Sequence, residues 1–362
     1  MGGGGNMKTT PSKQINNTIN FVKAIGCIGV ILIHCGFPEY IGILFASLAR
    51  FAVPFFTTIS GFYLLSKNTQ SISTSNLLRK IVHISKIIAY AELFALCFAI
   101  ISGFAMNYDI VKSFARYTNT TGLLKLLWDN TPLTYVHYWY LYALLYCYIT
   151  VLILYKVAPK CIIGKKISLC ALFLFIAFYL MNIISNSELP FDFLVPIGQD
   201  GSLSAIYNLF IFRSLPFFLT GVSIKFYERQ IRAIRILSKR MLVSTIFVGA
   251  ILSCLERFLW GDMQIYIGTH LIVLATFIFC IKYPDGINKK IEWIGKELSM
   301  TIYIIHISVM EIVNWVGASF GLNNIPLYYW LRPIITIVIS LLCASIFFSF
   351  NCHLRKTMAK CK

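Results

Sequence analysis

Long apolar runs separated by short polar connectors make up most of the chain between about residues 19 and 351. Most runs hold about 18 or more residues with few charges, the length that a helix needs to cross a hydrocarbon layer about 30 Å thick. We therefore predict an all-α, polytopic integral membrane protein with about ten transmembrane helices. The predicted spans are 19–36, 44–65, 81–102, 136–156, 166–186, 204–224, 241–259, 265–282, 298–318 and 330–351.

Composition excludes a soluble globular protein, because 58% of the 362 residues are hydrophobic and only 13% are charged. The net charge of +18 could indicate a nucleic-acid partner, but most Lys and Arg lie in connectors without the pattern of a nucleic-acid module. The 11 cysteines lie mostly inside apolar runs without CxxC spacing, which argues against a disulfide framework and against a metal site. Membrane lipids are the expected surroundings.

Basic residues are concentrated in every second connector, which the positive-inside rule places in the cytoplasm. This pattern predicts that both termini are cytoplasmic. The two longest loops, about 103–135 and 187–203, then lie outside. We interpret residues 1–6 as an artificial extension and residues 7–362 as a single transmembrane domain without an internal repeat.

The first predicted span carries Lys23 and His34, eleven residues apart. Eleven helical steps turn by about 1100° and rise by about 16 Å, so the two side chains share a helix face. Gly26 and Gly29 between them allow close approach by another helix. A buried charge costs about 2.5–3.5 kcal/mol, which favours a function. Lys23 suits a phosphorylated carrier and His34 a general base; alternatively, Lys23 reaches lipid phosphates and His34 hydrogen-bonds at the rim.

The Lys23-x10-His34 pair resembles the Arg-x10-His signature in the first helix of the membrane-bound acyltransferase-3 family. The family usually has Arg at position 23 and often an acidic residue at position 20, where this chain has Asn20. Lys keeps the charge but lacks the bidentate fork of Arg. Further segments resemble the family's motifs in the same order: Arg50–Phe56 with Ile59–Phe62, His137–Leu141, Phe217–Gly221 and Ser299–His306.

The resemblance implies an O-acyltransferase of the bacterial cytoplasmic membrane. Cytoplasmic acyl-CoA, most simply acetyl-CoA, would be the donor substrate, with no permanently bound cofactor and no metal. The acceptor would be a hydroxyl of an extracytoplasmic glycan or lipid-linked glycan. The expected site residues are His34, Arg50, Tyr303 and His306 for catalysis, Lys23, Ser60 and Arg213 for the donor, and Trp139, Tyr140, His137 and Glu256 for the acceptor.

Structural roles are the alternative for several of these residues. Arg50 either pairs with an acidic loop residue or anchors at the membrane interface. Tyr303 and His306 share a helix face and could simply join helices. Trp139 and Tyr140 suit an interfacial aromatic belt as well as a sugar-binding surface.

A different function, transport of an amino-acid-like small molecule on the same fold, is also open, because polar groups inside spans can bind a substrate. Arg213 lies three residues before Pro216 and is a candidate for lining such a path. Glu256 and Arg257 are adjacent near the outer end of a helix, which favours local ion pairing.

Overall fold

The structure is a computed structural model that describes residues 16–65, 72–106, 132–158, 165–186 and 209–360. Within these ranges the chain is entirely helical, as predicted. Most of the predicted loops 103–135 and 187–203, and the extension 1–6, lie outside the described residues. Seven helical stretches are long and apolar enough to cross a membrane: Asn17–His34, Glu39–Phe62, Thr74–Ala105, Val136–Val157, Lys239–Trp260, Lys289–Ser319 and Pro326–Thr357.

The predicted number of ten spans is therefore not confirmed. The predicted span 265–282 forms α14 (Ile267–Lys282), whose 16 residues make a shorter apolar helix. The predicted span 166–186 forms α8 (Lys165–Asn186). The predicted span 204–224 begins outside the described residues and continues as α10 (Phe210–Arg213) and α11 (Leu215–Phe226).

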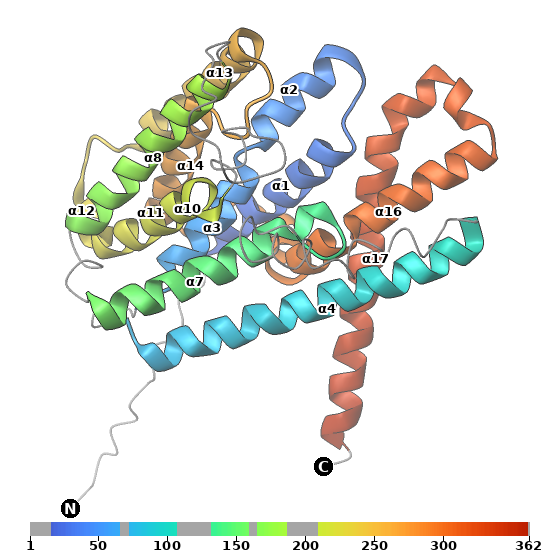
Figure 1. Cartoon of the computed structure of the whole chain (residues 1–362), viewed down its shortest axis with the longest axis horizontal. Helices are drawn as coiled ribbons and strands as arrows, with labels where there is room; N and C mark the ends of the chain where they lie inside the picture. Colours follow the sequence, from blue (N-terminus) through green and yellow to red (C-terminus); the bar gives the residue numbers. More distant parts are fainter. Residues whose placement is uncertain (1–15, 66–71, 107–131, 159–164, 187–208, 361–362) are drawn as a thin grey trace, which may run out of the picture.

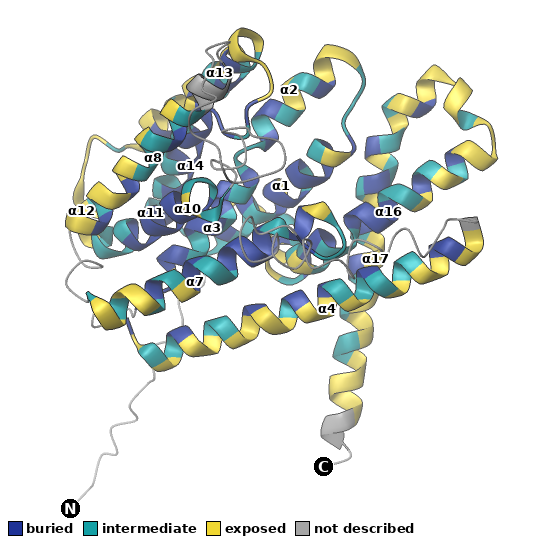
Figure 2. Cartoon of the chain, viewed as in Figure 1, coloured by how far each residue is buried: buried dark blue, intermediate teal, exposed yellow. Residues whose placement is uncertain are grey.

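Three helices lie at the centre of the bundle: α1 (Asn17–His34), α2 (Glu39–Ala49) and α3 (Ala52–Phe62) (Figure 1). One flank holds α8, α11, α14 and α13 (Lys239–Trp260), and the other holds α16 (Ser299–Ser319) and α17 (Pro326–Lys360). The long helix α4 (Thr74–Met106) runs beside α7 (Trp139–Val157). Buried residues concentrate at the centre, and apolar side chains are exposed on outward faces, as lipid contact requires (Figure 2).

Two small residues allow α1 to pack tightly at the centre. A Cβ atom added at Gly26 would lie 3.1 Å from Cζ of Phe56, and one at Gly29 would lie 3.2 Å from Cβ of Ala49. The predicted close approach of a neighbouring helix at these glycines is confirmed. It sets α1 against α2 and α3, so the C-terminal end of α1 faces the junction between those two helices.

Arg50 and Phe51 lie at a break between α2 and α3, where the sequence predicted one continuous span. Proline has no amide hydrogen, so Pro54 cannot donate to the carbonyl of Arg50 four residues earlier. The same arrangement recurs between α10 and α11, where Pro216 follows Arg213. Each break thus presents an arginine at an interrupted helix end.

The two broken helices cross at glycines. A Cβ atom added at Gly61 of α3 would lie 1.9 Å from the carbonyl oxygen of Phe218, and one at Gly221 of α11 would lie 2.0 Å from that of Thr58. Only hydrogen fits at such distances, so the crossing requires glycine at both positions. The segments 59–62 and 217–221 therefore form one packing unit, which sets the spacing of the two breaks.

The helix ends on the opposite side of the bundle are joined by polar contacts. The Asn17 amide donates to the carbonyl of Pro284 at 2.9 Å, which ties the start of α1 to the end of α14. The short helix α12 (Glu228–Ala233) also contacts α14, and its first residue, Glu228, pairs with Lys225 at 2.6 Å and Arg232 at 2.8 Å. Burial alone would raise the pKa of Glu228, but hydrogen bonds and positive charge from these two partners outweigh burial and lower it.

Candidate active site

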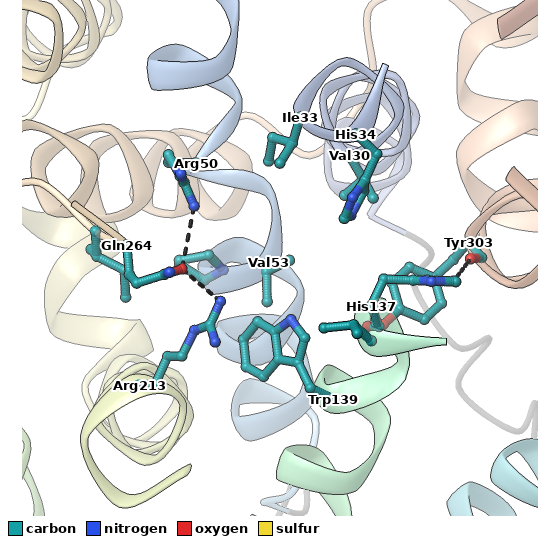
Figure 3. A pocket seen from close by; sticks show the side chains of 13 residues that line it. Val30, Ile33, His34, Arg50, Val53, His137, Trp139, Arg213, Gln264 and Tyr303 are labelled. Atoms are coloured by element: carbon teal, nitrogen blue, oxygen red, sulfur yellow. Dashed lines mark hydrogen bonds between the residues drawn. The ribbon is translucent and has the colours of Figure 1, made fainter. Parts of the chain in front are cut away.

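A cavity of about 260 Å³ lies where several helix ends meet (Figure 3). Its walls come from the end of α1, the break between α2 and α3, the start of α7, α10, the 261–266 loop and α16. Segments separated by more than 250 residues thus share one space. Six predicted site residues line it: His34, Arg50, His137, Trp139, Arg213 and Tyr303.

One wall of the cavity carries two arginines that share an acceptor. Arg50 donates to Gln264 Oε1 at 3.3 Å, and Arg213 donates to the same oxygen at 2.8 Å (Figure 3). Arg50 also pairs with Asp262 at 2.7 Å, which is the first of the two interactions considered for it in the sequence. We call Arg50, Arg213, Gln264 and Asp262 the arginine wall. Two positive charges are held in place there, because each guanidinium contacts the same short loop.

Trp139 lines the cavity next to the arginine wall. The guanidinium carbon of Arg213 lies 3.5 Å from the centroid of the Trp139 ring, a cation–π contact that fixes the plane of the indole. Tyr140 lies behind the cavity, where it is 7% exposed and its ring centroid is 5.8 Å from that of Tyr303. Trp139 therefore borders the cavity, and Tyr140 is part of the packing behind it.

The facing side contains three imidazoles, of which His34 and His137 line the cavity and His306 is buried beside them. The ring centroid of His34 lies 5.9 Å from that of His137 and 5.4 Å from that of His306, and the latter two are 4.6 Å apart. His137 and His306 are only 4% and 1% exposed. Of the two imidazoles that line the cavity, His34 is the exposed one, so its ring is the more accessible to a molecule entering there. We call these three residues and Tyr303 the histidine wall.

Backbone carbonyls determine which ring nitrogens carry hydrogen in the buried pair. A carbonyl can only accept, so His137 Nε2 donates to the Tyr303 carbonyl at 3.1 Å. His306 Nδ1 lies 3.2 Å from the carbonyl of Ile302 and 2.8 Å from that of Tyr303, so it also carries hydrogen. Within the described part of the chain, His306 Nε2 is buried without a hydrogen-bond partner. A neutral His306 therefore presents an unused acceptor nitrogen.

Tyr303 connects the histidine wall to α7. Its hydroxyl donates a short hydrogen bond to the carbonyl of His137, while its own carbonyl accepts from His137. This reciprocal pair joins α16 to η1 (Val136–Tyr138), the turn that precedes α7. The Tyr303 hydroxyl and carbonyl are thus both engaged in joining these two segments.

Lys23 and Ser60, the other residues expected to bind the donor, do not line the cavity. Lys23 is half-buried on α1 and interacts electrostatically with Glu297. The predicted passage from Lys23 to His34 therefore stays a prediction. Ser60 donates to the carbonyl of Phe56 at 3.1 Å and shares a side-chain hydrogen bond with Tyr140. Ser60 thus lies within the packing around α3.

Glu256 also lies outside the cavity lining. It is 2% exposed and accepts from the amides of Ile267 and Gly268, each at 3.1 Å. These are orphan donors of the first turn of α14, so Glu256 caps that helix. An ion pair was expected near Glu256, and it is formed by its neighbour Arg257, which pairs with Asp262.

Sequence reasoning missed Gln264 and Glu92. Gln264 lies in a short polar turn, and no local pattern indicates that it joins two arginines. Glu92 lies inside the predicted span 81–102, where a lone carboxylate is a signal that could have identified it. It accepts from the Tyr142 hydroxyl at 2.8 Å and the Thr134 hydroxyl at 2.5 Å, which joins α4 to the chain leading into α7.

Comparison with known protein families gives a match over nearly the whole chain. The matching family model carries the description Acyltransferase domain, that of the acyltransferase-3 family, and it covers residues 16–350. This range includes every residue that lines the cavity. No curated protein and no solved structure matches the chain.

Proposed function

Because the chain belongs to the acyltransferase-3 family, we propose that it is a membrane O-acyltransferase that uses acyl-CoA from the cytoplasm. The proposed acyl group is acetyl, and the proposed acceptor is a hydroxyl of an extracytoplasmic glycan or lipid-linked glycan. One observation carries this proposal: imidazoles and guanidinium groups face each other across a single cavity. These are the groups that general base catalysis and oxyanion stabilisation need.

The proposed orientation has ten spans with both termini in the cytoplasm of a bacterium, in its plasma membrane. The concentration of Lys and Arg in every second connector supports it. With α1 running outward from Asn17, His34 and the cavity lie toward the outer face, where a glycan would be available. The donor would approach from the opposite end, with its phosphates near Lys23. A helical rise of about 16 Å separates that residue from His34, a distance that an extended thioester arm would need to cover.

In the proposed reaction His34 takes the proton of the acceptor hydroxyl. The hydroxyl oxygen attacks the thioester carbonyl, forming a carbon–oxygen bond and placing negative charge on the carbonyl oxygen. Arg50 and Arg213 stabilise that charge, since the shared contact with Gln264 keeps both guanidinium groups at one wall. The carbon–sulfur bond then breaks, and the CoA sulfur leaves with the proton that His34 held.

His137 and His306 act in this scheme as positioning residues behind His34. Their donor nitrogens are engaged by carbonyls, so in the neutral form their other nitrogens can only accept. A hydrogen bond from His34 to His306 Nε2 would orient the His34 ring and stabilise its protonated form, as the third residue does in other base-assisted sites. The separation of 5.4 Å between the two ring centroids supports this role.

Trp139 is the proposed acceptor platform. A sugar ring has an apolar face that packs on an aromatic ring, and the indole of Trp139 is already held in plane by Arg213. Tyr140 and Glu256, which support the walls from behind, would influence acceptor binding only through the packing of those walls.

The decisive experiment supplies radiolabelled acetyl-CoA to one side of proteoliposomes that contain the purified full-length protein. The other side holds an extract of lipid-linked glycans from bacterial membranes. We expect release of free CoA and label in alkali-labile esters, both absent from His34→Ala protein. Accumulation of a radiolabelled amino acid in the vesicles, with no CoA released by either protein, would instead establish a transporter.

A further inference from the structure

A second cavity, of about 470 Å³, lies between α17 and the segment formed by α15 (Lys289–Trp293) and η4 (Ile294–Leu298). It shares no lining residue with the first cavity. Lys289, Lys290 and Trp293 form its rim, and all three side chains are exposed. We call this space the basic groove.

The basic groove changes from charged to apolar along its length. Its lysines are the first residues of the candidate membrane span Lys289–Ser319, whereas Leu298 lies about two turns deeper and is 1% exposed. The opposite side is formed by Leu341 and Ser345 of α17, inside the candidate span Pro326–Thr357. Eight residues separate Lys290 from Leu298, a rise of about 12 Å in a helix. The headgroup layer on each side of a bilayer is only about 5–8 Å thick, so this rise takes the groove from the level of the phosphates into the acyl-chain region.

The two rim lysines carry charge that the described part of the protein does not neutralise. Neither forms an ion pair there, whereas Lys225 and Lys296 pair with Glu228 and Glu297. The nearby Glu292 is not available to them, because its Oε1 accepts from the amides of Ile287 and Asn288 and its side chain is buried. An anionic group is thus the complementary occupant of the rim.

Trp293 adds a feature that is typical of a membrane interface. Its ring is 41% exposed and its centroid is 5.6 Å from that of Phe348 on α17, in an edge-to-face arrangement. Indole rings favour the headgroup level of a bilayer, where one side is apolar and the other is wet. The tryptophan therefore lies at the level where the charged and apolar parts of the groove meet.

We propose that the basic groove binds one anionic phospholipid, with its phosphate between Lys289 and Lys290 and one acyl chain along Leu298 and Leu341. The apolar residues deeper in the groove favour a phospholipid over a free phosphate, because a free phosphate would contact only the lysines at the rim. The far side of η4 contacts α1, since a Cβ atom added at Gly295 would lie 1.8 Å from the Asn20 carbonyl. A lipid in the groove would therefore stabilise the packing of η4 against α1.

The test measures lipid retention by the full-length protein in native mass spectrometry after delipidation and titration with phosphatidylglycerol or phosphatidylcholine. We expect wild-type protein to retain phosphatidylglycerol at least about 10-fold more tightly, because each lysine contributes roughly 1 kcal/mol toward an anionic lipid. The Lys289→Gln/Lys290→Gln variant should lose this preference. Ser345→Phe, which keeps both lysines and fills the apolar depth, should lose retention of phosphatidylglycerol as well.

Lys165→Gln/Lys166→Gln is the matched control, because it removes two adjacent exposed lysines at the start of another helix. It should bind phosphatidylglycerol like the wild type, and size-exclusion profiles of all variants report whether they fold. Equal retention of the two lipids by wild-type protein, or an equal loss in the control variant, would overturn the proposal. So would full competition by inorganic phosphate or acetyl-CoA, which would identify a soluble phosphorylated ligand.

Discussion

The arginine wall and the histidine wall border the same cavity but satisfy their polar groups differently. Arg50 and Arg213 both contact Gln264, and Arg50 also pairs with Asp262. On the facing side, His306 Nε2 is buried without a partner among the described residues, and His34 is exposed to the cavity. One wall therefore supplies fixed positive charge, while the other has nitrogens available to bind a proton.

The two walls are also supported differently. The arginine wall is built from two interrupted helices and a loop, and its Asp262 side chain is 60% exposed. In the histidine wall, the Tyr303 carbonyl of α16 holds the rings of both His137, which lies in the turn η1, and His306. The arginine side chains can be held by a partly exposed loop, because Arg50 contacts both Asp262 and Gln264 and Arg213 contacts Gln264 as well. Backbone hydrogen bonds thus fix the orientation of the two buried rings, and the exposed His34 ring lies beside them.

Removing the exposed imidazole should have the largest effect. We expect His34→Gln to lower kcat for acyl transfer by about 10²–10⁴-fold, since that is the usual contribution of a general base. Donor KM should change little, because His34 lies at the far end of α1 from Lys23. Steady-state release of CoA measures both constants. His83→Gln, which alters an exposed histidine of α4, is the control; near-normal turnover by His34→Gln would contradict the assignment.

Replacing the Arg50 guanidinium by an ammonium group should have the next largest effect on kcat. Arg50→Lys keeps the charge, but one ammonium group does not reproduce the forked contact with Asp262 and Gln264. We expect kcat to fall by about 10²-fold, near the lower end for loss of an oxyanion donor. Arg257→Lys is a matched control, since Arg257 pairs with the same Asp262 but does not line the cavity. Equal losses in both variants would indicate that Asp262 pairing matters only for loop stability.

The unused nitrogen of His306 predicts a smaller effect. Asn at this position can still donate to the Ile302 and Tyr303 carbonyls but has no equivalent of Nε2. Loss of one hydrogen bond worth about 1.4 kcal/mol predicts a roughly tenfold lower kcat for His306→Asn.

A double-mutant cycle separates this role from a structural one. If His306 acts through His34, the variant that carries both His34→Gln and His306→Asn should be no slower than His34→Gln alone. Independent, multiplicative losses in kcat would show that His306 contributes only to folding or acts separately.

The smallest effect on kcat should come from Glu228, a paired carboxylate that lines neither of the two cavities described above. Glu228 has a lowered pKa, so its ion pairs with Lys225 and Arg232 stabilise the fold above the unfolded-state pKa of about 4.3. This stabilisation is lost as the pH falls through the lower folded-state pKa. Glu228→Gln should lower the free energy of unfolding by about 1 kcal/mol at pH 7 without changing kcat. Thermal melts should show that the difference shrinks as the pH falls below about 4.3; a difference that does not change on acidification would contradict the charge argument.

The pattern along the chain predicted the all-helical membrane fold, because hydrocarbon thickness dictates how many apolar residues a span needs. It also identified Gly26 and Gly29 as points of close helix contact, since helical spacing places them on one face. Six of the predicted site residues do line the cavity, and the family motifs that contain most of them are local in sequence. Local periodicity and composition were sufficient for these conclusions.

Only the tertiary structure decided which distant residues meet. His34, His137 and His306 lie on three separate helices, and Gln264 joins Arg50 to Arg213 from a loop. Such contacts depend on crossing angles and on the relative rotation of helices, which glycine contacts such as Gly61 against Phe218 determine. The hydrophobic pattern of one helix does not indicate how a neighbouring helix is rotated about its own axis. That is why Glu256 resembled a site residue in the sequence but caps α14 in the fold.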